Sequence, residues 1–311
     1  MPGGYAHITL VNQMRDRLEG FPGMPSNVRL AYGDYQNYCE LGGVSPDYPY
    51  LDVFNGDSPA WADAMHYTNT TEFIRAAAKR VWAMNGAQQS KCLAWLLGYT
   101  AHVVGDVTIH PIVELKVGSY EANKTAHRIC EMHQDAYIFQ RMNVGKIGLA
   151  EYLDKEQNGL RACNRPGNED RIDADIFDLW NDTLAEVHAG IHRLNPPDID
   201  AWHRGFGGAV DAVEEGGALP ALARHVAVNA GLTYPDPEEV SREEYIDRLT
   251  TPEGTMSYDA VFDKALTHVA QAWAWLGEDI ANRQIARLNA LGAWNLDTGR
   301  DENNVLAYWT E

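Results

Sequence analysis

Residues 98–111, GYTAHVVGDVTIHP, bear most directly on the fold class and the chemistry of this chain. They lie in a mostly apolar run, 92–115, in which His102 and Asp106 stand four positions apart. Residues i and i+4 project from the same face of an α-helix, so two ligands on adjacent turns can grip one metal ion. Burying an imidazole and a carboxylate in an apolar helix is costly unless something pairs them. The stretch therefore predicts a central helix, buried rather than membrane-spanning, that carries a metal site.

His110 follows one turn after this pair and is itself followed directly by Pro111. The residue before a proline avoids the α region of backbone conformation, so we expect the helix to end within residues 105–108. His110 would then point away from His102 and Asp106. Such a geometry would suit a second metal ion.

A second pair lies in residues 126–137, AHRICEMHQDAY, where His127 and Glu131 are again four positions apart. His133 is two residues from Glu131 and cannot share its helix face, whereas Asp135 does share it and could hold a ligand in place. Zinc accepts imidazole nitrogen and carboxylate oxygen, and its catalytic sites often keep one position open for water. Two such pairs close together in the chain predict a zinc centre.

Three upstream residues are weaker candidates when each is taken alone. His66 stands just before a predicted helix, Asp47 lies in a polar segment, and His7 is close to the start of the chain. Residues of these types in such places are more often caps, turn residues or surface residues. Spacing alone does not separate Asp47 from its neighbouring carboxylates, which are Asp34, Asp52, Asp57 and Asp63.

The pattern along the whole chain indicates an all-α, single multi-helix domain. Helical patterns are expected at 5–19, 71–85, 88–105, 123–142, 173–194 and 259–291, with shorter helices joined by turns between the last two. The segment 20–65 is rich in Gly, Pro, Asp, Asn and Tyr, which predicts a long functional loop. We expect residues 1–145 to form a metal-binding helical core and residues 146–311 a helical C-terminal half packed in the same domain.

Composition limits the partners of the chain. Its 311 residues carry 44 acidic and 25 basic side chains, a formal net charge of -19. Such a surface repels phosphate polymers, which excludes duplex nucleic acid as a partner. A small phosphorylated substrate stays compatible, because bound divalent cations offset the negative charge locally. The alternative is that the acidity serves solubility alone.

Cysteine usage and the first residues bear on compartment. The four cysteines show no CxxC spacing, so we expect reduced thiols rather than a cysteine zinc site. The first residues, MPGGYAHITLVN, lack a basic region followed by a long apolar stretch. We therefore expect a cytoplasmic protein with no transmembrane segment.

Taken together, these motifs resemble the zinc-dependent phospholipase C family. The shared pattern is an early His, a loop Asp, a His before a helix, then HxxxD, a His and HxxxE, and it covers about residues 1–140. GYTAHVVGD followed by HP and HRICE is its most specific part. The resemblance implies an all-helical fold, shared with single-strand-specific nucleases, and a cleft that binds zinc.

The resemblance also implies a ligand set of two or three zinc ions. Carried over by position, the first ion would be held by Asp47, His66, His102 and Asp106, and the second by His110, His127 and Glu131. Asp106 would bridge to a third ion, completed by His7 and the amine and carbonyl of the chain start. The chain departs from secreted members of the family because it begins Met-Pro-Gly-Gly where they begin with Trp. The gap from Asp106 to His110 is also shorter than usual in the family, and that from Asp47 to His66 is longer.

What the resemblance implies for function is hydrolysis of a phosphate ester, most plausibly a phosphodiester, by a metal-activated water. Asp47 would be the catalytic residue that orients this water or takes its proton. The substrate would be a small phosphorylated molecule or a phospholipid head group. Four aromatic residues near the loop ligands could line its pocket or contact a choline-like group, unless they only pack the loop onto the core: Tyr48, Tyr50, Trp61 and Tyr67.

Two other functions fit the same residues. The scaffold could hydrolyse phosphomonoesters, or serve another biosynthetic reaction, as a metalloenzyme. It could also be a non-catalytic protein in which zinc only ties helices together, as closed four-coordinate sites do. His188 and His192 form a further i,i+4 pair without a carboxylate partner, so we interpret them as structural.

Overall fold

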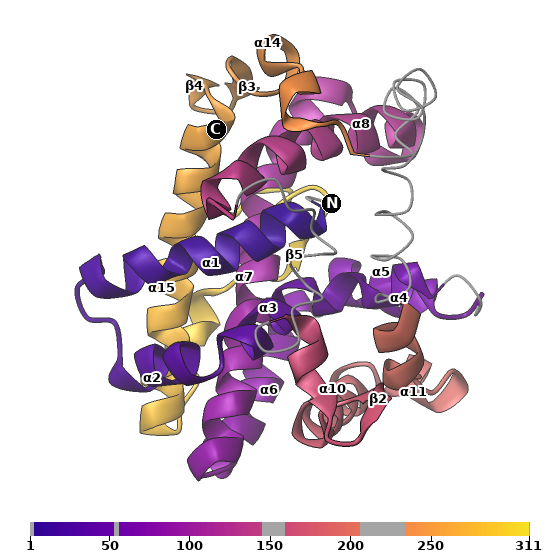
Figure 1. The fold of residues 1–311 in the computed structure, drawn as a ribbon, viewed down its shortest axis with the longest axis vertical. Coiled ribbons are helices and arrows are strands. Elements are labelled where there is room, and N and C mark those ends of the chain that lie inside the picture. The colour runs from indigo at the N-terminus through magenta and orange to yellow at the C-terminus, as the bar shows by residue number, and fades with distance from the viewer. Residues whose placement is uncertain (1–2, 53–55, 145–158, 206–233, 311) are drawn as a thin grey trace.

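The computed structural model describes residues 3–52, 56–144, 159–205 and 234–310. One long helix, α7 (Gly86–Val117), forms the centre of the fold, and its residues from Cys92 to Val113 are buried. Figure 1 shows α15 (Tyr258–Asn282) running alongside α7, and α1 (Gly4–Gly20) crossing both. The helices α2 (Ser26–Asp34), α3 (Gln36–Val44) and α6 (Thr70–Ala83) also pack against α7. The predicted all-α fold class is confirmed.

The central helix does not end before its proline, so the predicted end within residues 105–108 is wrong. Pro111 lies inside α7, which continues for six residues beyond it. A proline within a helix removes one backbone donor and crowds the carbonyl four residues earlier, here that of Val107. The C-terminal segment covers this place: the indole of Trp309 donates to the carbonyl of Thr108 at 2.9 Å. His110 therefore stays on α7, one turn beyond Asp106, and no helix end redirects its side chain.

The segment 20–65 is helical in large part, and the prediction of a long loop there is wrong. It holds α2, α3, the short α4 (Tyr48–Leu51) and α5 (Pro59–Tyr67), with a 3-10 turn over Ser45–Asp47. Four of its five prolines, all except Pro22, stand at or next to helix starts, where a missing backbone donor costs nothing.

Two glycines, Gly42 in this segment and Gly98 in α7, serve packing rather than turns. A Cβ on Gly42 would lie 1.9 Å from the carbonyl oxygen of Trp95, and one on Gly98 would lie 1.8 Å from that of Cys39. Helices α3 and α7 therefore touch backbone to backbone, and this contact requires glycine on both sides. Through it, the end of α3 is brought directly beside the first metal-ligand candidates on α7.

The remaining elements follow the predicted order with shifted boundaries. The predicted third helix is α8 (Tyr120–Ile138), extended by a 3-10 turn over Phe139–Met142. The helix expected at 173–194 is broken at His188 into α10 (Ala174–Val187) and α11 (Ala189–Leu194). The last helix, α15, ends at Asn282 rather than at residue 291. Of the shorter helices expected before α15, α14 (Arg242–Tyr245) is described, while residues 206–233 lie outside the described part.

Three small antiparallel hairpins complete the described chain. They are β1 (Asn164–Arg165) with β2 (Asn168–Ile172), β3 (Leu249–Thr251) with β4 (Gly254–Met256), and β5 (Trp294–Asn295) with β6 (Arg300–Asp301). Short 3-10 turns lie at Leu160–Cys163, Pro237–Glu239 and Leu288–Ala290.

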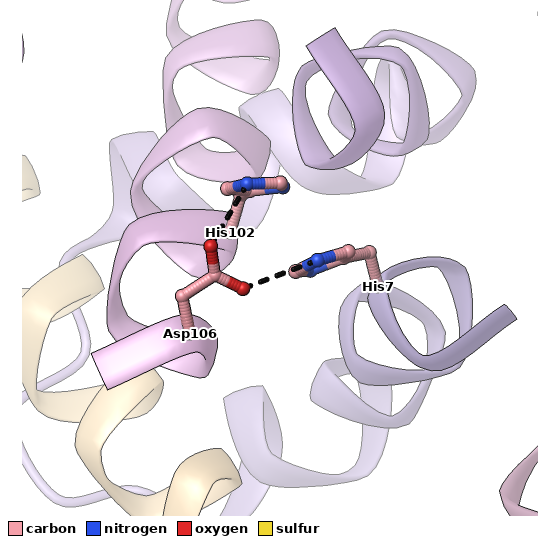
Figure 2. Close-up of side chains that lie close together, drawn as sticks. All are labelled: His7, His102 and Asp106. Atoms are coloured by element: carbon pink, nitrogen blue, oxygen red, sulfur yellow. Dashed lines mark ion pairs between the residues drawn. The ribbon is translucent and has the colours of Figure 1, made fainter. Parts of the chain in front are cut away.

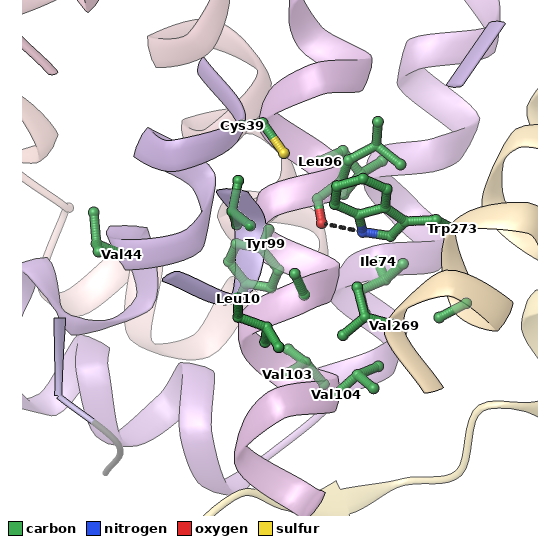
Figure 3. Packing of buried hydrophobic residues seen from close by; sticks show 14 of the residues in the cluster. Leu10, Cys39, Val44, Ile74, Leu96, Tyr99, Val103, Val104, Val269 and Trp273 are labelled. Carbon is green, nitrogen blue, oxygen red and sulfur yellow. Dashed lines mark hydrogen bonds between the residues drawn. The ribbon is translucent and has the colours of Figure 1, made fainter. Parts of the chain in front are cut away.

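One apolar core joins both halves of the chain. Figure 3 shows Leu10, Tyr99 and Val103 packed with Val269 and Trp273, and the Trp273 indole donates to the carbonyl of Leu97 at 2.8 Å. Among the described helices, α7 alone is long and apolar enough to cross a membrane, and its apolar window is entirely buried inside the protein. All four cysteines are free and buried.

Candidate metal centre

Helix α7 presents three candidate ligands on consecutive turns: His102, Asp106 and His110. Their side chains are almost fully buried, with exposed fractions of 0%, 0% and 1%. Helix α1 brings His7 to the same place, while α5 brings His66 and the turn after α3 brings Asp47. Ligands from three separate parts of the chain therefore meet around Asp106.

Two histidines of this cluster, His66 and His102, have their tautomer fixed by the backbone. The Nδ1 of His66 donates to the carbonyl of Ala62 at 2.7 Å, and that of His102 donates to Gly43 at 2.9 Å. In the neutral rings both Nε2 atoms then carry lone pairs. These two atoms lie only 3.3 Å apart, so a shared cation, not a hydrogen bond, is what satisfies both.

The carboxylates complete a four-residue arrangement, the His66 group: Asp47, His66, His102 and Asp106. The Oδ1 of Asp47 lies 3.3 Å from His66 Nε2, and the Oδ2 of Asp106 lies 3.2 Å from His102 Nε2. The cross distances, from His66 to Asp106 and from His102 to Asp47, are 3.9 and 4.0 Å. Ligands bound tetrahedrally to zinc at about 2.0–2.1 Å stand about 3.3 Å from one another. The group therefore has close to the right size for one zinc ion.

The other oxygen of Asp106 faces a different partner. Its Oδ1 lies 3.3 Å from the Nε2 of His7, whose ring stacks on that of His102 with centroids 3.9 Å apart (Figure 2). One ligand atom from each of His7, His102 and Asp106 falls within 4.8 Å of the others, and we call this set the His7 group. Asp106 is thus placed to serve two ions, one through each oxygen.

A looser set, the Glu131 group, forms where α7 faces α8. The Oε1 of Glu131 lies 3.7 Å from His110 Nε2 and 3.9 Å from His127 Nδ1. The opposite ring nitrogens are held by carbonyls: His110 Nδ1 donates to Leu296, and His127 Nε2 donates to Gly118 at 2.6 Å. Both histidines therefore turn a lone pair toward Glu131.

Unpartnered buried atoms test whether zinc fits this centre. Within this centre, the following buried atoms have no hydrogen-bond partner: His7 Nε2, Asp47 Oδ1, both carboxylate oxygens of Asp106, and His110 Nε2. Leaving a buried polar group unpartnered costs about 1–3 kcal/mol, and more for a charged group. All five atoms face another ligand candidate at metal-bridging distance. The donor set is therefore one that zinc ions would satisfy.

Electrostatics keeps the carboxylates of the centre ionised. Burial alone would raise the pKa of Asp106, but His102 and His110 outweigh it and hold the pKa well below its usual range. Burial is outweighed in the same way at Asp47, whose pKa is lowered by His102 and His66. Burial instead lowers the pKa of His110, which favours the neutral ring that can bind a metal.

The structure places all eight predicted ligands in this centre and separates Asp47 from its competitors. The side chain of Asp52 accepts a hydrogen bond from Ser58 at 2.6 Å, and that of Asp63 accepts one from Tyr50 at 2.8 Å. Asp34 and Asp57 are exposed. Asp47 is distinguished by its position between α3 and α4, which only the folded chain reveals.

The four aromatic residues predicted to contact substrate fall into two pairs. Tyr48 and Trp61 are buried, with exposed fractions of 0% and 1%, and both pack in an aromatic cluster with other core rings. Their burial favours the packing alternative, and the substrate contact expected for them stays a prediction. Tyr50 and Tyr67 instead lie beside the ring of His66, with centroid distances of 5.6 and 6.4 Å, and reach solvent.

Asp135 supports the centre through the helix that carries one of the ligand candidates. Its carboxylate accepts hydrogen bonds from the backbone N–H groups of Gly3 and Ala6, at 3.1 and 3.2 Å, and from the hydroxyl of Tyr234. It therefore caps α1, the helix that carries His7, rather than holding Glu131 itself. Burial, together with the nearby charge of Glu131, raises the pKa of Asp135 to about 8.

The groups that sequence reasoning missed are mostly main-chain groups. The carbonyls of Gly43, Ala62, Gly118 and Leu296 orient the four histidines on α5, α7 and α8. Any residue type supplies a carbonyl, so the sequence carries no signal for them. Asp297, which accepts a hydrogen bond from Tyr67 at 2.8 Å, lies far along the chain from every predicted ligand.

The fold and the candidate ligands define an all-α protein with a candidate metal-binding centre. A family model described as zinc dependent phospholipase C matches residues 6–190, more than half of the chain and all eight ligand candidates. The chain belongs to the zinc-dependent phospholipase C family. No curated protein and no solved structure matches it significantly.

Proposed function

We propose that this protein is a zinc-dependent hydrolase of phosphate esters, and more specifically a phospholipase C-like phosphodiesterase. The observation that carries the proposal is the placement of Asp106, whose two oxygens face the His66 group and the His7 group. A carboxylate shared in this way is typical of sites that hold two metal ions close together. Membership of the zinc-dependent phospholipase C family supports the same assignment.

Zinc ions bound in this centre would act as Lewis acids toward a phosphoryl oxygen and would lower the pKa of water. The chain's own contribution is to fix the ligands: backbone carbonyls hold four of the five histidines, those on α5, α7 and α8, in the tautomer that binds metal. Because His66, His102 and Asp106 are fully buried, bulk water is kept away from these three ligand candidates.

Within the His66 group, solvent reaches Asp47. Its side chain is 14% exposed, whereas those of His66, His102 and Asp106 are 0% exposed. Asp47 is therefore the carboxylate that an incoming substrate and water can reach. Its lowered pKa keeps it ionised at neutral pH, the form that orients a water molecule or accepts its proton.

The residues around this opening favour a small substrate. Tyr50 and Tyr67 stand there beside His66, and they donate hydrogen bonds to Asp63 and Asp297. Together with the net charge of -19, these carboxylates disfavour a long polyanion. A phospholipid head group or another small phosphodiester fits this opening better than a nucleic acid strand.

The test compares hydrolysis of a chromogenic phosphodiester, the matched monoester, and phosphatidylcholine vesicles, before and after chelation. We expect diester or lipid hydrolysis that chelation abolishes and zinc restores. A clear preference for the monoester would replace the diesterase assignment with the phosphomonoesterase one. Full activity in chelator would contradict the proposal as a whole.

A further inference from the structure

We propose that the C-terminal hairpin β5–β6 is a positioning element of the metal centre, shared by the His66 group and the Glu131 group. The hairpin lies beyond residue 190, where the match to the family model ends. The inference rests on the zinc binding proposed above and adds a part of the chain that the ligand motifs do not include.

One residue of the hairpin turn, Leu296, contacts both groups through its main chain. Its backbone N–H donates to the carbonyl of His66 at 2.9 Å, and its own carbonyl accepts from His110 Nδ1. The first bond fixes the end of α5 that carries one ligand, and the second fixes the tautomer and ring orientation of another. A displacement of Leu296 would therefore disturb two ligands that stand 44 positions apart in the sequence.

The hairpin is itself held in place against α6 and α7. Thr70 Oγ1 donates to the carbonyl of Trp294 at 2.8 Å, which attaches β5 to the start of α6. On the other side, Gly299 sits directly on α7: a Cβ there would lie 2.5 Å from Pro111 Cγ and 2.6 Å from the carbonyl oxygen of Val107. The proline that follows His110 is thus the surface on which the hairpin rests.

The hairpin also reaches the opening of the centre. Asp297, next to Leu296, accepts the hydroxyl of Tyr67, which is the residue next to His66. Two neighbouring residues of the hairpin therefore bind two neighbouring residues of α5, one pair through main chain and one through side chains. This doubled contact leaves α5 and the hairpin little freedom to move separately.

A matched pair of glycine variants tests the proposal. Gly299→Ala places a Cβ against Pro111 and Val107, whereas Gly167→Ala, in the β1–β2 hairpin, places one with nothing within 4 Å. Both glycines have positive φ, +64° and +75°, so both substitutions bear a similar backbone strain. Only the first pushes a hairpin away from the metal centre.

The readout is metal binding by the full chain, not turnover. Metal-free protein is titrated with Co²⁺, whose visible spectrum reports ligand geometry, and the bound zinc is counted separately. We expect Gly167→Ala to match wild type, and Gly299→Ala to lose roughly 10- to 100-fold in affinity for at least one ion, with an altered spectrum. Unchanged titration of Gly299→Ala would overturn the inference.

A second variant covers the case in which Gly299→Ala does not fold. Thr70→Val keeps the side-chain shape but removes the hydroxyl that donates to the carbonyl of Trp294 in β5. A smaller loss of Co²⁺ affinity in the same direction supports the proposal, and wild-type affinity contradicts it. Wild-type protein that binds no zinc would instead overturn the proposed function, and this inference with it.

Discussion

Replacing Asp106 with asparagine should remove most of the stabilisation that zinc gives the protein. Asp106 is fully buried, and each of its two oxygens faces a histidine at 3.2–3.3 Å, so the substitution removes a charged ligand from two groups at once. At zinc concentrations 100 times the Kd, one bound ion stabilises a fold by about 2.7 kcal/mol. An affinity loss of at least about 10- to 100-fold at each of two sites therefore removes about 3–5 kcal/mol.

The assay is thermal unfolding with and without zinc at pH 8, on wild type and on Asp106→Asn. A change of 1 kcal/mol shifts the melting temperature of a chain this large by about 2 °C, so the zinc-induced shift should be smaller by about 5–10 °C in the variant. In chelator, Asp106→Asn should melt at the same temperature as wild type or at a higher one, because a neutral amide costs less to bury than an uncompensated carboxylate.

A matched control is Asp34→Asn, which removes the same charge from an exposed position on α2. It should leave the zinc-induced shift unchanged. If Asp106→Asn and wild type gained equally from zinc, the shared-carboxylate geometry would be refuted.

Three further predictions concern other parts of the molecule. Burial lowers the pKa of His203 to about 4, so between about pH 6.5 and 4 the unfolded chain binds a proton that the folded chain does not. Stability should therefore fall as the pH falls through this window, by up to about 3 kcal/mol from this group, and His203→Asn should flatten the dependence in chemical denaturation measured at several pH values. Tyr67→Phe removes the hydrogen bond to the hairpin carboxylate and should raise KM for a phosphodiester more than it lowers kcat; steady-state kinetics with an equal fall in kcat would contradict a substrate-side role. Gly42→Ala drives a Cβ into the backbone of α7 and should destabilise by about 1–3 kcal/mol or more, whereas Gly33→Ala in α2, with nothing within 4 Å, should be neutral or stabilising by up to about 1 kcal/mol in the same unfolding assay.

The ligand pairs could be predicted because their signal is local. His102 with Asp106, and His127 with Glu131, are each one helical turn apart, so helix geometry alone puts each pair on one face. The structure bears out this proximity, with 3.2 and 3.9 Å between the paired atoms. Outside residues 20–65, the order of the longer helices could likewise be predicted, because it follows from apolar periodicity.

The predictions that failed share a different cause: tertiary contacts outweighed the local conformational preferences of the residues. Pro111 indicated a helix end, but the segment containing Gly299 and Trp309 packs over it and the helix continues. Gly42 falls in the segment predicted to be a loop, yet its missing side chain is what lets α3 touch α7. Neither contact leaves a trace near these residues in the sequence.

The site predicted from the sequence was incomplete for a similar reason. Leu296 acts only through its main chain, and Asp297 becomes a neighbour of Tyr67 only when the chain's end folds back onto α5. The four predicted aromatic residues differ in burial. The sequence gives no indication of whether the ring of a tyrosine belongs to the core, as that of Tyr48 does.

Counting and locating the metal ions in protein purified without added zinc tests the central claim most directly. Elemental analysis combined with anomalous X-ray scattering should find two or three zinc ions, with Asp106 bound to two of them and His66 and His102 sharing one. Crystals in which the Nε2 atoms of His66 and His102 face each other with no metal between them, from protein that had zinc freely available, would contradict the account.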